Sequence, residues 1–355
     1  MSTQRIGHTA TLLTNGKVFV IGGYTLDEYG YSLPLNSVEL YDPLTGLWTR
    51  SANMTIGRLS HTAIRLANGK VLVAGGSGSD GSNALGAISS AELYDPSTGL
   101  WTGTGNMTVA RQGHTATLLT NGKILVAGGS EYDGYRNSGF LNSAELYDPS
   151  TRSWTKTGDM SIGRQNQISV LLTNGKVLVA GGYYFDGYDY GGSINSPELY
   201  NPSTGLWTPT GNMSISRQFS TGSLLINGKV LAVGGETDET FTNGGFLSST
   251  ELYDPSTGLW TNSSNMNTGR MTHAMCSLAN GTMLVTGGVG YDPNVFMMPL
   301  NDTELYNPST GLWSKTDSMK IARALHTATL LTNGKVLVAG GYSGAASLDS
   351  AELYY

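Results

Sequence analysis

A pair of adjacent glycines recurs along the chain, and each pair lies 53 residues after the previous one. The pairs occupy residues 22–23, 75–76, 128–129, 181–182, 234–235, 287–288 and 340–341. Six tryptophans keep the same interval, namely Trp48, Trp101, Trp154, Trp207, Trp260 and Trp313. An arginine begins each unit, at Arg5, Arg58, Arg111, Arg164, Arg217, Arg270 and Arg323. The chain therefore consists of seven copies of one unit, and a repeat of this length is typical of a propeller or a solenoid.

One unit, residues 111–163, contains four short segments with the composition of β-strands. "HTATLL" and "KILVAGG" flank Asn121-Gly122, which predicts a two-residue type I′ hairpin. "SAELYD" follows a variable loop, and a turn at Asp148-Pro149 precedes the fourth segment around Trp154. Four antiparallel strands form one propeller blade, and no helix-length amphipathic segment supports a solenoid. We therefore predict an all-β, seven-bladed β-propeller of four-stranded antiparallel blades that occupies residues 1–355 as a single domain.

The motif "R-x-x-H-T-A", the glycine pair, the tyrosine of "AELYD" and the following tryptophan together resemble the kelch repeat. The resemblance covers essentially the whole chain and implies a seven-bladed propeller. It also implies that strands A to D run from the central channel outward and that the glycine pair ends strand B. The B–C connections within blades and the D–A connections between blades would then share one face, which in kelch proteins commonly holds the ligand.

The seventh unit differs from the others in its expected strand count. Met1 aligns with Met54 just before a strand A, and the last residues, "SAELYY", match a strand C. About eleven residues of the seventh unit, including its tryptophan, have no counterpart in the sequence. We therefore predict a three-stranded seventh blade whose open outer edge could pair with another chain. A longer parent protein that supplies the segment is an equal alternative.

Composition excludes several classes of partner. The formal net charge is -6 and the basic residues are not clustered, which argues against nucleic-acid binding. No apolar run approaches the length of a membrane span, and "MSTQRIGHTA" lacks the apolar core of a signal peptide. The single cysteine, Cys276, excludes an intramolecular disulfide and a cysteine-based zinc site. The sequence does not indicate a cellular compartment.

Residues that recur in every unit are expected to serve the scaffold. The tryptophans and the tyrosines of "AELYD" are expected to pack between blades. Each arginine is expected to pair with one of seven glutamates in register; an anion site made by seven arginines at the channel mouth is the alternative. The histidines at one register position are expected to act as hydrogen-bonding struts rather than as a metal ring: His8, His61, His114, His273 and His326.

The units diverge in their B–C loops, where binding function is expected. Aromatic residues gather in the loops of units three to five, and units four and five replace "R-x-x-H" with "RQNQ" and "RQFS". We therefore place a ligand site at blades three to five, with these residues: Tyr132, Tyr135, Arg164, Gln165, Asn166, Tyr183, Tyr184, Phe185, Tyr188, Arg217, Gln218 and Phe219. A recurring acidic position in these loops suggests calcium only weakly, because no loop has the alternating oxygen ligands that calcium requires.

The function expected from these patterns is non-enzymatic binding of a protein or a glycan on the loop face, without a cofactor. Galactose oxidase, whose catalytic domain is also kelch-like, suggests a copper-radical oxidase as the competing class. Such enzymes use a Cys–Tyr crosslink, a further tyrosine and two histidines. Cys276 is the only thiol and no histidine lies outside the repeat register, which counts against this class. A purely architectural propeller is the third hypothesis.

Overall fold

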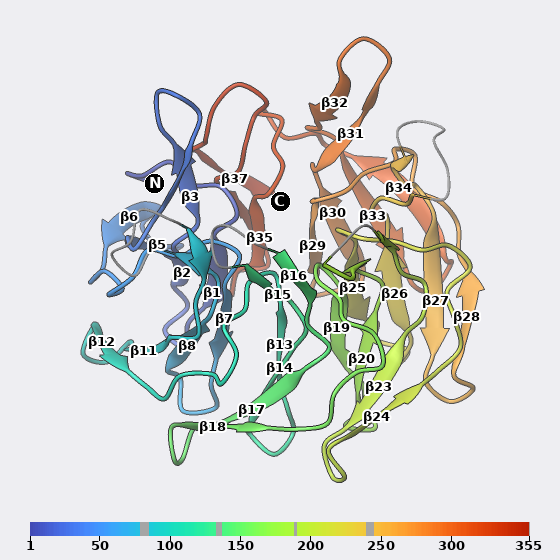
Figure 1. Cartoon of the computed structure of the whole chain (residues 1–355). Helices are drawn as coiled ribbons and strands as arrows, with labels where there is room; N and C mark the ends of the chain where they lie inside the picture. The colour runs from blue at the N-terminus through green and yellow to red at the C-terminus, as the bar shows by residue number, and fades with distance from the viewer. Residues whose placement is uncertain (79–84, 133–136, 188–189, 239–244, 355) are drawn as a thin grey trace.

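A computed structural model describes residues 1–78, 85–132, 137–187, 190–238 and 245–354. Within these residues the chain forms seven antiparallel sheets arranged as blades around a central channel, without an α-helix (Figure 1). The described part of the chain accordingly contains no helix that could span a membrane. The predicted all-β, seven-bladed propeller is confirmed.

The strands of each blade follow one another in sequence order from the channel outward, with four strands in blades one to six. The inner strands are β1 (Thr9–Leu12), β7 (Thr62–Arg65), β13 (Thr115–Leu118), β19 (Ile168–Leu171), β25 (Thr221–Leu224), β29 (Ala274–Ser277) and β35 (Thr327–Leu330). The second strands are β2 (Val18–Ile21), β8 (Val71–Ala74), β14 (Ile124–Ala127), β20 (Val177–Ala180), β26 (Val230–Val233), β30 (Met283–Thr286) and β36 (Val336–Ala339). The third strands are β5 (Val38–Asp42), β11 (Ala91–Asp95), β17 (Ala144–Asp148), β23 (Glu198–Asn201), β27 (Thr250–Asp254), β33 (Thr303–Asn307) and β37 (Ala351–Tyr354). The outer strands are β6 (Leu47–Arg50), β12 (Leu100–Gly103), β18 (Ser153–Lys156), β24 (Leu206–Pro209), β28 (Leu259–Asn262) and β34 (Leu312–Thr316).

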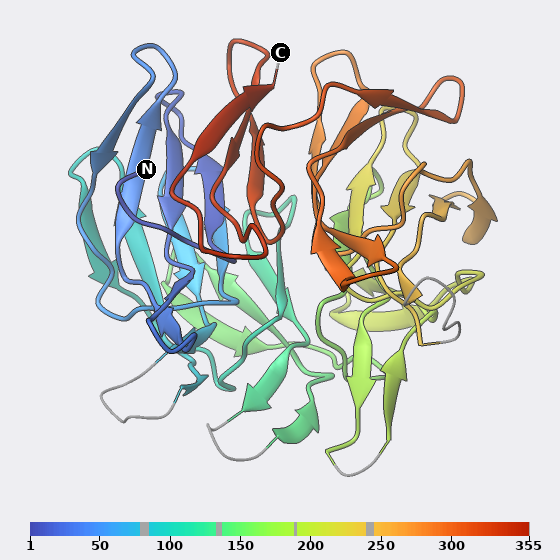
Figure 2. The ribbon, with the colours of Figure 1, turned by 90° about the horizontal axis from the view of Figure 1, so that it is seen from above.

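Blade seven has only the three strands β35, β36 and β37, as the alignment of the repeat predicts. It stands between blade one and blade six, and the two ends of the described chain lie close to it (Figure 2). The Met1 amino group donates to the Asp349 carbonyl at 2.8 Å, which links the two ends directly.

The prediction for the Asn-Gly hairpins is wrong in its turn type. The connection in blade three has three residues, because the Leu119 amide bonds the Lys123 carbonyl and the Gly122 amide bonds the Leu119 carbonyl. Only Gly122 adopts a positive φ, of 81°, whereas a type I′ turn would require one at Asn121 as well. Asn121 instead accepts the Lys123 amide with its side chain. This pattern is a type I turn followed by a glycine bulge.

The hydrophobic core lies between blades and is built from the second strands, which are buried along their whole length. Trp154 shows how the outer strands join it. Its indole packs on Tyr147 with ring centroids 5.0 Å apart, and its Nε1 donates to the Gly105 carbonyl of the preceding blade at 2.7 Å. The predicted packing of the repeated tryptophan and tyrosine between blades is therefore confirmed.

The glycine pair is required by the approach of the neighbouring blade. Gly128 and Gly129 have φ angles of 70° and 92°. A Cβ atom on Gly128 would lie 2.5 Å from the Arg164 carbonyl oxygen of the next blade. The Gly129 amide donates to that same carbonyl at 2.8 Å. The pair thus brings two blades into backbone contact where strand B turns into the variable loop.

Candidate binding face

The B–C loops and the D–A connections lie together on one face, as the kelch resemblance implies. Among the described residues, five B–C loops contain a pair of short strands: β3–β4 (Tyr24–Leu26, Ser32–Pro34), β9–β10 (Ser77–Gly78, Gly86–Ala87), β15–β16 (Ser130–Tyr132, Asn137–Phe140), β21–β22 (Tyr183–Phe185, Gly191–Ser193) and β31–β32 (Val289–Asp292, Phe296–Pro299). In blade four, Gln165 of the D–A connection pairs with Tyr183 of the hairpin, and Gln218 pairs with Glu236 in the next blade. Residues predicted for the site from two different connections are therefore neighbours.

The arginines predicted for the site, Arg164 and Arg217, have no exposed side-chain surface. Arg164 donates to the carbonyls of Gly181 and Ser196 and to the Glu198 carboxylate within its own blade. All seven arginines pair in this way with a glutamate, at N–O distances of 2.8–3.2 Å. The expected ion pair in each blade is confirmed. Arg164 and Arg217 belong to the scaffold, and the arginines do not form an anion site at the channel mouth.

Four of the five histidines link the inner strands of adjacent blades. The His114 Nε2 lies 3.0 Å from the Thr62 hydroxyl, and His8, His61 and His273 make the same kind of contact at 2.7–3.0 Å. The His326 Nε2 instead lies 2.8 Å from the Thr286 hydroxyl on the second strand of blade six. Burial lowers the pKa of His114 to about 3, so the ring is neutral. Gln167, in the same register, bonds the Ala127 carbonyl. These side chains act as the predicted struts, and no set of metal-binding side chains occurs among the described residues.

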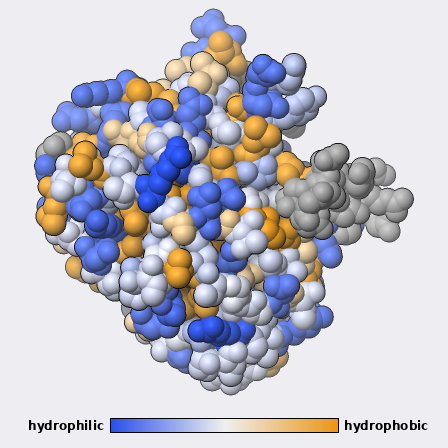
Figure 3. Space-filling model, turned by 90° about the vertical axis from the view of Figure 1, so that its left-hand side faces the viewer, coloured by the Kyte–Doolittle hydropathy of each residue, from blue (hydrophilic) through white to orange (hydrophobic). Residues whose placement is uncertain are grey.

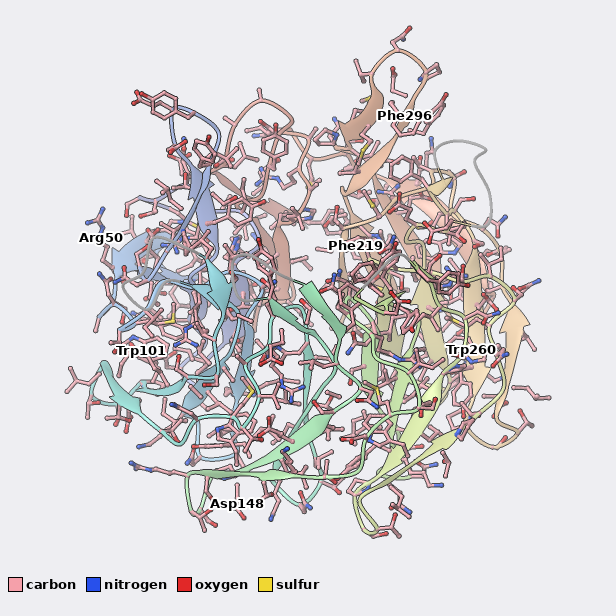
Figure 4. All side chains as sticks on the ribbon, viewed as in Figure 1. Arg50, Trp101, Asp148, Phe219, Trp260 and Phe296 are labelled. Atoms are coloured by element: carbon pink, nitrogen blue, oxygen red, sulfur yellow. The ribbon has the colours of Figure 1, made fainter. Side chains whose placement is uncertain are left out.

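The position before each histidine, or before Gln167 and Ser220 in blades four and five, has a left-handed backbone. Its residues have φ angles of 51–63°: Gly7, Ser60, Gly113, Asn166, Phe219, Thr272 and Leu325. Asn166, Phe219, Thr272 and Leu325 line a hollow of about 320 Å³, and Figure 4 shows Phe219 near the middle of the ring. The left-handed backbone costs roughly 1 kcal/mol at each residue with a side chain. Backbone hydrogen bonds between these residues of adjacent blades stabilise this conformation; for example, the Asn166 amide donates to the Gly113 carbonyl at 3.1 Å.

The hairpin of blade four divides its aromatic residues between its two faces. Tyr183 and Phe185 face blade three, with ring centroids 5.9 and 6.0 Å from Phe140. Tyr184 lies on the other face, 6.3 Å from Tyr190. Tyr184 and Tyr190 line a cavity of about 530 Å³ together with serines, glycines, Ile162, Ile194 and Asn195.

The remaining predicted residues fall into two groups. Tyr132 ends strand β15 in the hairpin of blade three and is partly buried. Tyr135 and Tyr188 lie outside the described residues. The predicted constellation therefore separates into a channel-mouth part, with Asn166 and Phe219, and a hairpin part centred on Tyr184.

Two carboxylates stand beside the hairpin part. Asp238 is exposed and accepts the Ser193 amide at 2.7 Å, and Glu236 is partly buried. Burial and the neighbouring Asp238 raise the pKa of Glu236 above its ordinary value. Neither carboxylate has a lysine or arginine within ion-pair distance in the described part of the chain. This edge of the face is therefore locally negative.

The recurring acidic loop position has a structural use where the structure describes it. Asp27 accepts the amides of Tyr29 and Tyr31, and Asp292 accepts the amide of Asn294. These carboxylates cap the turns of their own hairpins, which is a common role of aspartate in turns.

The sequence prediction missed an apolar element of this face, the hairpin β31–β32 of blade six. Val295, Phe296 and Met297 are 62, 57 and 47% exposed, and Figure 4 shows Phe296 on a hairpin that projects beyond the ring. By contrast, the side shown in Figure 3 has hydrophobic residues scattered among hydrophilic ones. The run Val-Phe-Met-Met in a loop was the available signal.

The residues required for a copper-radical site do not come together around Cys276. Cys276 is 9% exposed in strand β29 and packs in a cluster with Leu284, Met319 and Val338. Burial raises the pKa of this thiol above its ordinary value. His273, three residues earlier, uses its Nε2 on the Thr221 hydroxyl. The donor set around Cys276 therefore does not fit copper.

Comparison with protein families agrees with this architecture. A family model described as "Attractin/LZTR1 beta-propeller" matches residues 1–190, and the kelch motif matches residues 167–214 and 220–267. The chain belongs to the kelch-repeat β-propeller family. Kelch-like protein 23 of Mus musculus is 26% identical over 316 residues, which covers 89% of this chain and 51% of the relative. Kelch-like protein 36 of Rattus norvegicus is 25% identical over 66% of this chain and 36% of the relative.

This kelch propeller thus spans about half the length, or less, of these relatives. A solved structure titled "Novel fungal alcohol oxidase with catalytic diversity among the AA5 family, in complex with copper" matches it with a TM-score of 0.77. That match covers 99% of this chain and 74% of the other at 19% identity, so it supports the fold alone.

Proposed function

We propose that this kelch propeller is a non-enzymatic interaction module that binds a protein partner through the loop face of blades three to five. The observation that carries the proposal is the cavity of about 530 Å³ lined by Tyr184 and Tyr190. The partner segment carries an apolar side chain that enters this cavity and a basic residue that meets Asp238.

The chemistry of the cavity supports a peptide segment as the ligand. Tyrosines offer large apolar area together with a hydroxyl, and they are enriched at the centres of protein interfaces. Asp238 and Glu236 have no cationic partner in the described residues, so a basic residue of the partner gains a favourable interaction with them. Asn166 and Phe219 at the channel mouth lie on the same face and extend the surface available to a longer partner.

Binding to a peptide array and to a glycan array tests the proposal. We expect the purified chain to select peptides that combine an aromatic or aliphatic residue with lysine or arginine. Tyr184→Ala and Asp238→Asn are expected to weaken the selected peptides about tenfold each, a loss typical of a central interface residue. Tyr29→Ala is the matched control, since Tyr29 is a 77% exposed tyrosine on the hairpin of blade one.

Three results would contradict the proposal. One is peptide binding that Tyr184→Ala and Asp238→Asn leave unchanged. Another is selection of glycans instead of peptides, which would assign the face to carbohydrate. The third is the absence of binding to either array, which would favour a purely architectural propeller. Phe219→Ala, measured in parallel, reports whether the channel mouth takes part.

A further inference from the structure

The outer edge of strand β37 differs from the corresponding edge in the other six blades. In blade three, strand β17 pairs on its outer side with β18, so that Tyr147 lies opposite Trp154 and Glu145 opposite Lys156. Strand β37 pairs through Glu352, Leu353 and Tyr354 with β36 alone within the described residues. Its second edge therefore presents backbone groups of the kind that accept an added strand.

Two cavities flank this edge, one on each side of the sheet. The smaller, of about 160 Å³, lies toward blade six and is lined by Thr303, Asp317, Met319 and Tyr354 among others. The larger, of about 510 Å³, lies toward blade one and is lined by Tyr41, Trp48, Ala351 and Leu353 among others. In a complete blade, side chains of the outer strand point alternately to these two sides.

The complete blades show which side chain belongs in the smaller cavity. In blade six, Trp313 packs on Tyr306 with ring centroids 5.1 Å apart, and the Tyr306 hydroxyl bonds Ser263 at 3.0 Å. Tyr354 is held in the same way by a bond of 2.6 Å to the Thr316 hydroxyl. The ring of Tyr354 is therefore already positioned as the platform on which a tryptophan packs.

The backbone on the far side of the cavity also matches a tryptophan seat. Beside Trp313, the Ser264 carbonyl accepts the Thr250 hydroxyl at 2.7 Å. Beside the smaller cavity, the Asp317 carbonyl accepts the Thr303 hydroxyl at 2.5 Å. The cavity thus reproduces the walls of the Trp313 site, and ring packing rather than an indole hydrogen bond would retain the occupant.

The charge at the edge indicates a second feature of the occupant. The residue opposite the glutamate of the third strand is basic in three blades, where Arg50, Lys156 and Lys315 fill the position. The Glu352 side chain is 18% exposed, whereas that of Glu145 is 0% exposed. A basic residue two positions after the tryptophan would lie opposite Glu352.

We propose that the outer edge of β37, which is unpaired within the described residues, is a docking site for an extended polypeptide segment with a tryptophan followed two residues later by lysine or arginine. The segment adds to blade seven as a fourth, antiparallel strand. Its tryptophan fills the cavity beside Tyr354, and its backbone pairs with Glu352, Leu353 and Tyr354. This site lies on the outer rim of the ring and is independent of the loop face.

A peptide with the sequence of residues 148–157, "DPSTRSWTKT", tests the site, because it carries Trp154 and Lys156 in the required spacing. We expect fluorescence anisotropy of the labelled peptide to show saturable binding to the chain. The Trp154→Ala peptide is expected to bind at least about tenfold more weakly. Tyr354→Ala in the chain should weaken binding similarly, whereas Tyr354→Phe, which keeps the ring, should stay within about threefold.

A second pair of variants distinguishes a blocked site from a misfolded chain. Ser318→Trp places a large ring at the exposed rim of the cavity and should block the peptide, while Ser314→Trp on the outer strand of blade six is the matched control. Equal binding of the Trp154→Ala peptide, or no binding at all, would overturn the proposal. A dimer of the chain without peptide, seen by sedimentation velocity, would assign the edge to a second copy and also overturn it.

Discussion

Removal of the buried guanidinium of Arg111 is the most direct test of how each blade is held together. Arg111 donates to the carbonyls of Gly128 and Ser143, at 2.9 and 3.0 Å, and to the Glu145 carboxylate at 3.0 Å. Both side chains of the ion pair are 0% exposed. Arg111→Met leaves a buried carboxylate without its cation and removes one donor from each of two carbonyls, of which that of Ser143 keeps the Gly128 amide. We expect it to lower the free energy of unfolding by about 3–5 kcal/mol.

The same pair in blade seven provides an internal comparison. Arg323 bonds Glu352 at 2.8 Å, but the Glu352 side chain is 18% exposed, so water can solvate the carboxylate when the cation is removed. Arg323→Met should therefore cost less, about 1–3 kcal/mol. An unfolding entropy of about 2.1 cal/mol/K per residue gives a Tm shift of roughly 4–7 °C for Arg111→Met, if the propeller unfolds as one unit.

The pH dependence adds a second observable to this prediction. Burial raises the pKa of Glu145, but hydrogen bonds from Thr108 and the charge of Arg111 outweigh it and hold the pKa below the ordinary 4.5. The carboxylate therefore stabilises the fold above the unfolded-state pKa, and this contribution is lost as the pH falls through the folded-state pKa. Without Arg111 the pKa of Glu145 rises, so the stability difference between wild type and variant should shrink from pH 7 to pH 4.

Urea and thermal unfolding followed by circular dichroism measure both variants. The double variant Arg111→Met/Glu145→Gln should recover part of the loss, because it removes the unpaired charge. A Tm shift below about 1 °C for Arg111→Met would refute the reasoning, since it would mean that the buried pair is not coupled to folding. A larger loss for Arg323→Met than for Arg111→Met would refute the argument from exposure.

Three further predictions concern other parts of the propeller. Burial lowers the pKa of four histidines to about 3, namely His8, His61, His114 and His273, so NMR spectra should show these rings neutral from pH 8 to pH 4. The free energy of unfolding should fall as the pH drops below about 6.5, because the histidines bind protons in the unfolded chain before they do in the folded one. Titration of these rings near pH 6.5 in the folded protein would contradict this. Arg152 has a φ of 56° at a position where five other blades have glycine. In urea unfolding, Arg152→Gly should therefore raise the free energy of unfolding by up to about 1 kcal/mol, whereas Arg152→Ala should not. Equal effects of the two variants would argue against backbone strain. Phe296→Ser and Met297→Ser should reduce binding of a hydrophobic dye without changing Tm, because both side chains are exposed; a Tm loss of several degrees would show that the hairpin supports the blade.

The residues of the candidate site show where sequence reasoning reached its limit. Aromatic residues in the fourth loop predicted a cluster, and the structure brings Tyr184 together with Tyr190 at a cavity. The alternation of side chains along β21 sends Tyr183 and Phe185 to the opposite face, against Phe140 of another blade. Arg164 was predicted for the site because the D–A connections were expected beside the variable loops, but its side chain points into its own blade. The apolar hairpin with Phe296 was missed because exposure depends on how far a loop projects.

The sequence by itself determined the blade count, the order of the strands and the three-stranded seventh blade, because a 53-residue unit seen seven times averages out local ambiguity. It did not determine the turn at Asn121-Gly122, where backbone hydrogen bonds select the three-residue connection. Only the tertiary structure decided which repeated polar groups are buried and which cavities remain open, since both depend on contacts between residues of adjacent blades. The glycine pair is explained only by sequence and tertiary structure together. Its spacing is visible in the sequence, and its cause is the Arg164 carbonyl of the neighbouring blade, 2.5 Å from where a side chain on Gly128 would begin.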